Sequence, residues 1–142
     1  GNPLIFGGCV RDIAIFGVRQ FASDIDIVFD GDKDNLRNVC NTRGFSKNKY
    51  GGYRGKLKDW DIDIWPICET WAFRNGFIEY EDKGSLLETT IMNWDSIIFD
   101  WHEKKIICRD NYFNDLKDGF LDIVLAQKYV WFCVPLLPAT IV

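Results

Sequence analysis

Apolar and polar residues alternate along two stretches of the chain, which is the pattern of a β-strand with one buried face. In residues 24–29, isoleucine and phenylalanine alternate with two aspartates and a valine. In residues 60–65, isoleucine again alternates with aspartate, a tryptophan stands at either end, and Pro66 closes the run. Both stretches therefore predict strands that carry aspartates on one face.

Shorter patterns predict the remaining elements. Val10, Ile13 and Phe16 form the apolar side of a helix that Gly17 should end. The elements expected besides the two strands are a strand at 4–6, this helix at 8–16, a polar turn at 30–35 followed by a helix to about residue 40, a hairpin at 44–58 around Gly51-Gly52, a short helix around Leu86-Leu87, strands at 96–101 and 105–108 across a turn at 102–104, and a partly helical segment at 112–128 with a weak point at Gly119.

Together these elements predict one α/β (α+β) domain over residues 1–128, with a mixed β-sheet flanked by helices. The 142 residues are the length of one ordinary domain, and a first residue other than Met leads us to expect further residues upstream. Residues 129–142 are an apolar tail that is interrupted by Pro135 and Pro138 and is too short to span a membrane. The tail can be a core element, a truncated helix or an interface segment. We expect no membrane partner.

Composition narrows the class of protein. Hydrophobic residues make up 47% of the chain and charged residues 27%, as in an ordinary folded domain. The six tryptophans are expected mainly in the core, because aromatic side chains bury much area. A net charge of −4 gives no global sign of a nucleic-acid binder. Residues 43–58, however, contain six basic side chains and no acid, a strip that suits either a polyphosphate or a solvated hairpin.

Cysteine and histidine are placed in a way that excludes two kinds of site. Five cysteines are scattered singly, and His102 is the one histidine of the chain. These spacings argue against a zinc site and against a disulfide framework. Because a reducing compartment fits the scattered cysteines, we expect a cytoplasmic protein, and we expect His102 in an exposed turn.

Asp24 and Asp26 are the first candidates for chemistry. Because they lie two residues apart on a strand, their side chains project from the same face and can share one divalent ion or bracket two. Two-metal phosphoryl transfer requires such an arrangement, with ions about 3.5–4 Å apart. Mg²⁺ prefers carboxylate and phosphate oxygens as ligands. The alternative interpretation of the pair is an ordinary solvent-facing strand edge.

The segment ahead of this pair, residues 7–12, links the first strand to the first helix. Its paired glycines, Gly7 and Gly8, allow a close approach of the backbone, and the N–H groups of a helix start attract phosphate oxygens. Arg11 can add a charged donor to a polyphosphate or pair with Asp12. The combination predicts a turn that binds a triphosphate beside the two aspartates.

A third acidic stretch, residues 30–35, has the spacing that begins a calcium loop. An EF-hand requires Gly at its sixth position and Glu at its twelfth, where this chain has Asn35 and Asn41. We therefore interpret the stretch as a helix-capping turn.

The sequence GGCVRD followed by SDIDIVF resembles the GGxxRD and DxD signature of a known head domain, that of tRNA CCA-adding enzymes and bacterial poly(A) polymerases. These enzymes belong to the DNA polymerase beta-like nucleotidyltransferase superfamily. The resemblance is strongest over residues 3–30 and implies a mixed sheet with flanking helices, a glycine turn on the triphosphate, and Asp24 and Asp26 as metal ligands. The superfamily adds a third carboxylate from a later strand, for which we choose Asp63, with Asp61 on the same face as the alternative.

The resemblance also has a departure. Residues 90–93 are similar to the Thr-Ile-Asn end of the family's arginine-rich motif, which implies that Asn93 helps to bind the incoming nucleotide. Aligned in this way, Leu87 and Glu88 stand where the family has two arginines. This difference affects selection between CTP and ATP and leaves the inferred metal site unchanged. The chain also lacks room for the tRNA-binding neck, body and tail, so we do not expect a complete CCA-adding enzyme.

These observations predict a Mg²⁺-dependent nucleotidyltransferase. It would bind ATP or another nucleoside triphosphate, move the nucleoside monophosphate to an acceptor hydroxyl and release pyrophosphate. Asp63 would bind metal or deprotonate the acceptor, which can be an RNA 3′ end, a protein or a small molecule. The alternative function is a non-catalytic nucleotide-sensing or protein-interaction module on the same fold, motivated by the altered segment at Asn93 and by the apolar tail.

Overall fold

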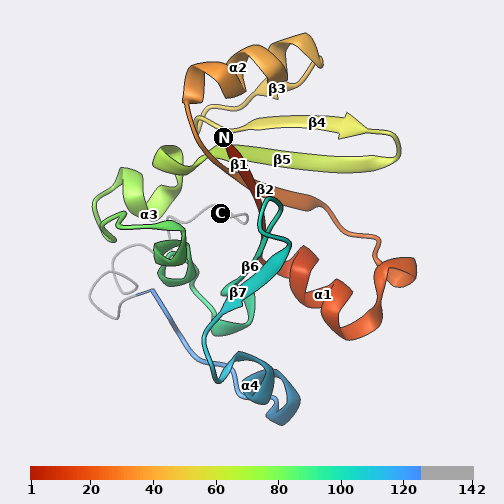
Figure 1. The fold of residues 1–142 in the computed structure, drawn as a ribbon, viewed down its shortest axis with the longest axis vertical. Helices are drawn as coiled ribbons and strands as arrows, with labels where there is room; N and C mark the ends of the chain where they lie inside the picture. Colours follow the sequence, from red (N-terminus) through yellow and green to blue (C-terminus); the bar gives the residue numbers. More distant parts are fainter. Residues whose placement is uncertain (126–142) are drawn as a thin grey trace.

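A seven-stranded mixed β-sheet is the centre of the computed structural model, which describes residues 1–125 (Figure 1). The strand order is β3-β4-β5-β2-β1-β6-β7. β2 and β5 are parallel, and the other neighbouring pairs are antiparallel. The strands are β1 (Asn2–Phe6), β2 (Ile25–Asp30), β3 (Ser46–Lys47), β4 (Tyr53–Leu57), β5 (Trp60–Pro66), β6 (Ile97–Asp100) and β7 (Lys105–Cys108).

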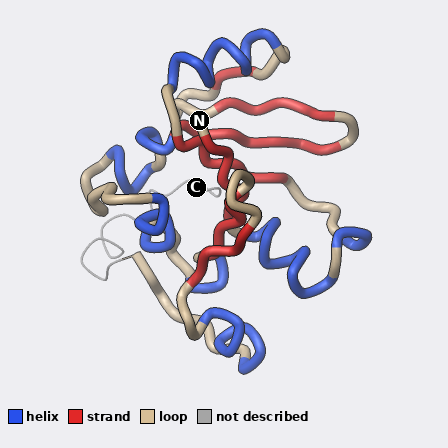
Figure 2. Tube along the Cα trace, viewed as in Figure 1, coloured by secondary structure: helices blue, strands red, loops and turns tan. Residues whose placement is uncertain are grey.

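Helices lie around the strands on several sides, as Figure 2 shows. The α-helices of the described residues are α1 (Gly8–Phe16), α2 (Lys33–Thr42), α3 (Trp71–Arg74) and α4 (Tyr112–Asp118). Four 3-10 helices join them: η1 (Val18–Gln20), η2 (Ile67–Glu69), η3 (Lys83–Glu88) and η4 (Asn93–Asp95). The mixed sheet with flanking helices confirms the predicted fold class. In the described part of the chain, no helix is long and apolar enough to cross a membrane.

The two faces of the sheet carry different side chains. Paired residues of neighbouring strands point to the same face, and successive residues of one strand alternate between faces. Asp26 pairs with Asp63, and the next pair is Ile27 with Ile64. We call the face with the two aspartates the carboxylate face and the opposite face the isoleucine face.

Helices α1, α2 and α4 pack on the isoleucine face. Val10 of α1 and Tyr112 of α4 are buried together against Ile97 of β6. Toward the other edge of the sheet, Leu36 of α2 packs with Tyr53 of β4. In Figure 1, α2 lies beside β3 and α4 lies beside β7, so this helical layer extends from one edge of the sheet to the other.

The carboxylate face is partly covered by the segments around η2 and η3. Leu4 of β1 and Val28 of β2 are fully buried in one cluster with Ile67 and Leu86. Burial of each such side chain contributes roughly 1.5–3 kcal/mol. Since Asp26 is the residue that precedes Val28 on the same face of β2, this core fixes the position of the first aspartate strand.

Sequence patterns identified the long elements and some of the short ones. The predicted helix at 8–16 is confirmed and ends at Gly17, whose φ of 80° suits glycine. The helix-capping interpretation of residues 30–35 is also confirmed, because the Asp32 carboxylate accepts the N–H groups of Asp34 and Asn35. The short helix expected around Leu86 is the 3-10 helix η3. Helix α3 was not predicted, and residues 126–128 of the last segment and the tail at 129–142 lie outside the described residues.

The expectation that the tryptophans lie in the core is wrong for all five that the structure describes. Trp65, Trp71 and Trp94 are half-buried, and Trp60 and Trp101 are exposed. Each of the two exposed rings is covered on one side: Trp60 stacks on Phe21 with 5.2 Å between ring centroids, and the Lys104 Nζ lies 3.4 Å from the centroid of Trp101. One covered side gives much of the gain of burial and needs no space in the core. Trp131 lies outside the described residues.

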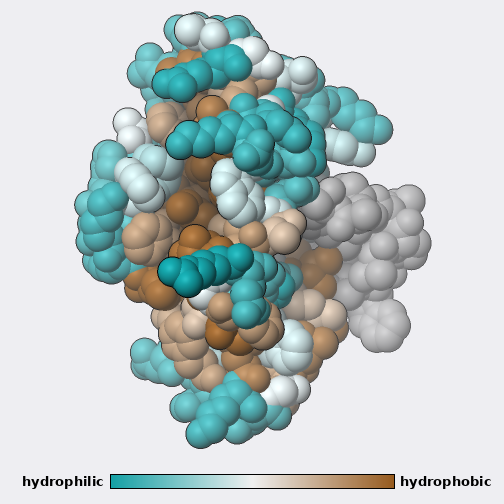
Figure 3. Space-filling model, turned by 90° about the vertical axis from the view of Figure 1, so that its right-hand side faces the viewer, coloured by the Kyte–Doolittle hydropathy of each residue, from teal (hydrophilic) through white to brown (hydrophobic). Residues whose placement is uncertain are grey.

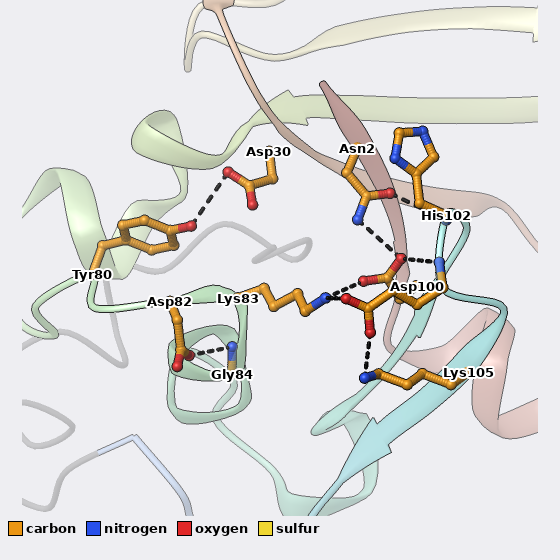
Figure 4. Close-up of polar contacts among 10 residues, drawn as sticks. Asn2, Asp30, Tyr80, Asp82, Lys83, Gly84, Asp100, His102 and Lys105 are labelled. Atoms are coloured by element: carbon orange, nitrogen blue, oxygen red, sulfur yellow. Dashed lines mark hydrogen bonds and ion pairs between the residues drawn. The ribbon is translucent and has the colours of Figure 1, made fainter.

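A buried carboxylate ties the sheet to η3 (Figure 4). The Asp100 side chain has no exposed surface; its oxygens accept hydrogen bonds from Lys83 Nζ at 2.6 Å, Asn2 Nδ2 at 2.9 Å and the Glu103 backbone N–H at 2.9 Å. The Glu103 N–H and the Lys83 ammonium hold the pKa of Asp100 well below its ordinary range. Lys83 also pairs with the Glu103 carboxylate, as does Lys105. Because a buried charge is tolerated when it is fully paired, these contacts make Lys83 a structural residue.

We predict that Lys83→Met lowers the midpoint of thermal unfolding by roughly 5 °C or more, because Asp100 is left buried without its cation. The matched control is Lys105→Met, which removes an exposed ion pair and should shift the midpoint by less than about 2 °C. Because the pKa of Asp100 is lower in the folded state than in the unfolded state, ionised Asp100 stabilises the fold. This stabilisation is present at pH values above the ordinary aspartate pKa and is lost as the pH falls. The difference between parent and Lys83→Met should therefore shrink below about pH 4. Equal midpoints for the two variants at pH 7 would contradict this account.

Candidate functional site

Three aspartates predicted from the sequence lie together on the carboxylate face. Asp26 of β2 and Asp63 of β5 are direct partners in the parallel pairing, and neighbouring strands are about 4.8 Å apart. Asp24 stands immediately before β2 and two residues before Asp26. The two strands are brought side by side by a crossover that contains α2, β3 and β4. The structure therefore brings these three side chains to one site.

Two of the three aspartates, Asp26 and Asp63, have raised pKa values. The pKa of Asp26 is raised to about 7, first by burial and then by the negative charges of Asp63 and Asp24. Burial also raises the pKa of Asp63, against the lowering effect of Arg54. Carboxylates that repel one another in a partly buried site gain from a nearby cation, which removes the repulsion. Such a cluster has the donor chemistry of a divalent-metal site.

A cation from the protein already contacts two of the three aspartates. Arg54 of β4 donates to Asp63 through one terminal nitrogen and to the Asp24 carboxylate through the other, at 3.1 Å. As the side chains lie, no three His, Cys, Asp or Glu residues within residues 1–125 are arranged to hold a metal ion. Asp61, the alternative third carboxylate, lies on the same face but is only half-buried, 3.6 Å from Lys56 Nζ. Its environment resembles that of a surface ion pair, whereas Asp63 is buried beside Asp26.

The glycine turn lies beside the aspartates. Gly7 is the N-cap of α1 with a φ of 71°, a conformation that favours glycine, and no side chain caps this helix start. The first N–H groups of a helix have no partner within the helix and carry the positive end of its dipole. The antiparallel pairing of β1 with β2 ends at Ile5 opposite Ile27, so Gly7, two residues farther on, lies beside the start of β2 and its aspartates. Burial, followed by the charges of Asp26 and Asp12, raises the pKa of the Cys9 thiol to about 11. The turn and the carboxylates therefore form one site.

Arg11 is held by two carboxylates at this end of α1. Its Nε lies 2.9 Å from Asp12 Oδ1, and its Nη1 lies 2.7 Å from Asp95 Oδ1. The contact with Asp95 joins η4 to the start of α1, and the negative charge of Asp95 adds to the raised pKa of Asp26. The sequence suggested the contact with Asp12 and gave no signal for Asp95, because that residue comes from η4. The sequence identified Arg54 as part of the basic strip, but its contact with Asp63 follows from the pairing of β4 with β5.

Asn93 has a different environment from the one expected of a nucleotide ligand. Its side-chain nitrogen donates to the Asp115 carboxylate at 3.4 Å and to the Phe120 carbonyl at 3.1 Å. Its side-chain oxygen accepts the Asp122 N–H at 2.8 Å. Both ends of the amide thus hold the segment after α4, and a contact with nucleotide stays a prediction. Leu87 is buried in the core, which agrees with the departure from the family's arginine.

The basic strip at residues 43–58 borders the carboxylate face. In the antiparallel pairing of β4 with β5, Arg54 is opposite Asp63 and Lys56 is opposite Asp61. The space-filling view shows hydrophilic residues over the end of the molecule where α2 and the β3–β4 hairpin lie in Figure 1 (Figure 3). Positive charge next to the aspartates suits a ligand with phosphate groups.

The raised pKa of Asp26 gives a prediction about stability. A carboxyl whose folded pKa is above its unfolded value contributes stability below the unfolded pKa, and this contribution is lost as the pH rises through the folded pKa of about 7. In the presence of a chelator, Asp26→Asn should therefore raise the free energy of unfolding at pH 8 by about 2 kcal/mol. The gain should decrease as the pH falls toward 5.

Denaturant titrations of parent and variant at pH 5 and pH 8 measure this effect. Asp61→Asn is the matched control: it removes a half-buried carboxylate with a solvent-accessible ion pair from the same face and should change the free energy by less than about 0.5 kcal/mol. A loss of stability at pH 8 in Asp26→Asn would contradict the proposed repulsion among the aspartates.

Comparison with known proteins finds the same fold in solved structures. No protein-family model and no curated protein sequence matches the chain. Solved structures do match, among them a CCA-adding enzyme in complex with CTP, with a TM-score of 0.67 and 19% identity over 94% of this chain. The Thermotoga maritima CCA-adding enzyme in complex with tRNA matches with a TM-score of 0.64 and 19% identity, again over 94% of this chain.

A third similar structure is a tRNA nucleotidyltransferase in complex with a primer tRNA and an incoming ATP analogue, with a TM-score of 0.60 and 18% identity over 82% of this chain. The chain spans about a third of the length of these neighbours, from 31% to 34%. At this identity the likeness establishes the fold. The residues of this chain thus form an acidic site, next to a glycine turn, on the fold found in tRNA nucleotidyltransferase structures.

Proposed function

We propose that this chain is a Mg²⁺-dependent nucleotidyltransferase domain over residues 1–128. It would transfer a nucleoside monophosphate from a nucleoside triphosphate to an acceptor hydroxyl and release pyrophosphate. The observation that supports this most strongly is the register of β2 and β5, which pairs Asp26 with Asp63 beside the uncapped start of α1. A fold shared with CCA-adding enzyme structures supports the same reaction class. A cytoplasmic location stays a prediction from the scattered cysteines.

The donor set of the site fits Mg²⁺. Asp24, Asp26 and Asp63 supply carboxylate oxygens from one face of the sheet, and their mutual repulsion is relieved by a divalent cation. These three residues would hold the metal. When bound, magnesium supplies charge stabilisation to the attacking and leaving oxygens of an in-line displacement.

Residues of the chain would bind and orient the triphosphate. The N–H groups at the start of α1 are directed at ligands beyond the helix end, and the φ of Gly7 lets the backbone turn there. Gly8 has no side chain to separate a phosphate from these N–H groups. Arg11, one turn into the helix, is a further donor once it leaves Asp95 or Asp12. Asn93 would contact the nucleotide once its amide leaves the segment after α4, which it now holds through Phe120 and Asp122.

The reaction itself needs one proton acceptor. The acceptor hydroxyl oxygen would form a bond to the α-phosphorus as the bond from that phosphorus to the bridging oxygen of pyrophosphate breaks. The hydroxyl proton would pass to a carboxylate, for which Asp63 is suited by its burial and its raised pKa. Asp26, with a pKa of about 7, is the direct strand partner of Asp63 and would hold the metal beside it.

The acceptor and the choice of nucleotide are the remaining parts of the proposal. The CCA-adding neighbours were solved with CTP, ATP and tRNA, and this chain spans about a third of their length. We propose a protein or a small molecule as the acceptor, because the net charge of −4 gives no global sign of binding to a long RNA. Leu87, buried where the family has an arginine, supports a mode of base selection different from that of the family.

We predict that the protein releases pyrophosphate from one or more nucleoside triphosphates in the presence of Mg²⁺ and a suitable acceptor. Asp26→Asn and Asp63→Asn should each lower the rate by about 100-fold or more, because each removes a charge from the carboxylate cluster. Asp61→Asn should retain the rate within about threefold, since Asp61 lies in an exposed ion pair. Pyrophosphate release measured with each triphosphate separately tests this; equal rates in Asp26→Asn and parent would exclude the site.

The acceptor class can be determined in the same assay. RNA, protein extract and small-molecule pools are offered separately with α-labelled triphosphate, and label transferred to one pool identifies the acceptor. We expect transfer to the protein or small-molecule pool and none in Asp26→Asn. Nucleotide binding that requires Asp24 and Asp26 without any pyrophosphate release would instead favour the nucleotide-sensing module. Transfer to RNA would overturn the preference for a smaller acceptor and leave the reaction class intact.

A further inference from the structure

Arg54 occupies a special position among the basic residues of the strip. It lies on β4 directly opposite Asp63, and β5 separates it from Asp26 on β2. One terminal nitrogen of its guanidinium contacts Asp63 Oδ2, and the other lies 3.1 Å from Asp24 Oδ2. A single side chain therefore joins two of the three carboxylates proposed to hold metal.

The planar guanidinium is suited to this bridging. Its nitrogens are fixed in a fork and each can donate to a separate carboxylate, which a lysine ammonium on a flexible stem does less well. The Asp63 side chain is 12% exposed and the Arg54 side chain is 51% exposed, so a buried carboxylate is neutralised by a cation that solvent can reach. The guanidinium can therefore leave without a large change in the fold.

The guanidinium and a divalent ion compete for the same two oxygens. A divalent ion bound to Oδ2 of Asp24 and Oδ2 of Asp63 would place its charge beside the guanidinium nitrogens that now contact these atoms, and like charges at that distance repel. Binding of metal to these two oxygens therefore favours movement of Arg54 away from them.

We propose that Arg54 is a built-in counter-ion of the carboxylate site, which holds Asp24 and Asp63 until a divalent cation displaces it. Arg54 then sets the concentration of metal at which the site is loaded. This inference rests on the proposed function, because it assigns the three aspartates to metal. It differs from that function in making a prediction about binding of metal without nucleotide or catalysis.

The chain offers a matched control for Arg54. Lys56 lies two residues farther along β4, on the same face, and its Nζ is 3.6 Å from Asp61 Oδ1. It has the same charge and belongs to the same basic strip, but its carboxylate partner is not one of the three proposed ligands. A general effect of positive charge would appear in both variants, whereas displacement of a bridging cation would appear in Arg54 variants alone.

The test is titration with Mn²⁺, in which the free ion is measured by electron paramagnetic resonance at pH 8 without nucleotide. Arg54→Gln should bind Mn²⁺ about tenfold more tightly than the parent. In this variant the metal ion no longer has to displace a guanidinium that is held by charge-assisted hydrogen bonds. Lys56→Gln should change the affinity by less than about threefold. Arg54→Lys, which keeps the charge and loses the fork, should lie between parent and Arg54→Gln.

A second readout follows Arg54 itself. In the ¹⁵N spectrum of the arginine side chains, the Arg54 signal, assigned by its loss in Arg54→Lys, should shift when Mg²⁺ is added to the parent. The signals of Arg37, which pairs with Asp34, and Arg74, which pairs with Glu69, should stay in place. An Arg54 signal that stays unchanged at saturating Mg²⁺ would overturn the inference.

The outcomes separate this inference from the proposed function. If Asp26→Asn abolishes Mn²⁺ binding but Arg54→Gln binds no more tightly than Lys56→Gln, the counter-ion role is overturned and the metal site stands. If neither parent nor Arg54→Gln binds Mn²⁺, both are overturned. Binding by Arg54→Gln where the parent shows none would support both.

Discussion

The parallel pairing of β2 with β5 is the constraint on which the site depends. It is the one parallel pair in a sheet whose other neighbouring strands, among the described residues, are antiparallel. A shift of one residue would turn Asp63 to the isoleucine face and away from Asp26. The register is held by apolar residues on both faces, with Val28 fully buried on one face and Ile64 packed against the α2 cluster on the other. Packing thus determines the positions of the charges.

The carboxylate site lowers the stability of the fold, whereas the packing around it raises that stability. Asp26 is partly buried next to two other aspartates, and its raised pKa measures the unfavourable energy of keeping it ionised. The fold also contains a fully buried carboxylate, Asp100, whose pKa is lowered by the Glu103 backbone N–H and the Lys83 ammonium. The contrast indicates a division of roles: Asp100 is satisfied within the fold and stabilises it, whereas the positive charge of Arg54 only partly offsets the burial of Asp26 and the repulsion by its neighbours, so Asp26 gains from a further cation. Functional sites are where such unsatisfied groups are expected.

Much of this arrangement could be predicted from the sequence because it is local. Alternation gave β2 and β5, and Gly17 gave the end of α1. The shared face of Asp24 and Asp26 followed from the period of a strand. The ionic partners of two arginines could not be predicted. Arg54 meets Asp63 only because β4 pairs with β5. Arg11 meets Asp95 only because of the position of η4, a short element that no sequence periodicity predicts. The packing role of Asn93 was missed for the same reason, because its contacts come from residues 22 to 29 positions farther along the chain.

The central claim is that Asp24, Asp26 and Asp63 form one metal-dependent site beside the glycine turn. The most direct measurement is anomalous diffraction from crystals grown with Mn²⁺ and a non-hydrolysable nucleoside triphosphate. The account predicts a manganese peak among these three carboxylates, with the triphosphate against the start of α1 and the Arg54 guanidinium moved away from Asp24 and Asp63. Manganese bound elsewhere, or a triphosphate away from Gly7 and Gly8 with the Arg54 bridge intact, would contradict it.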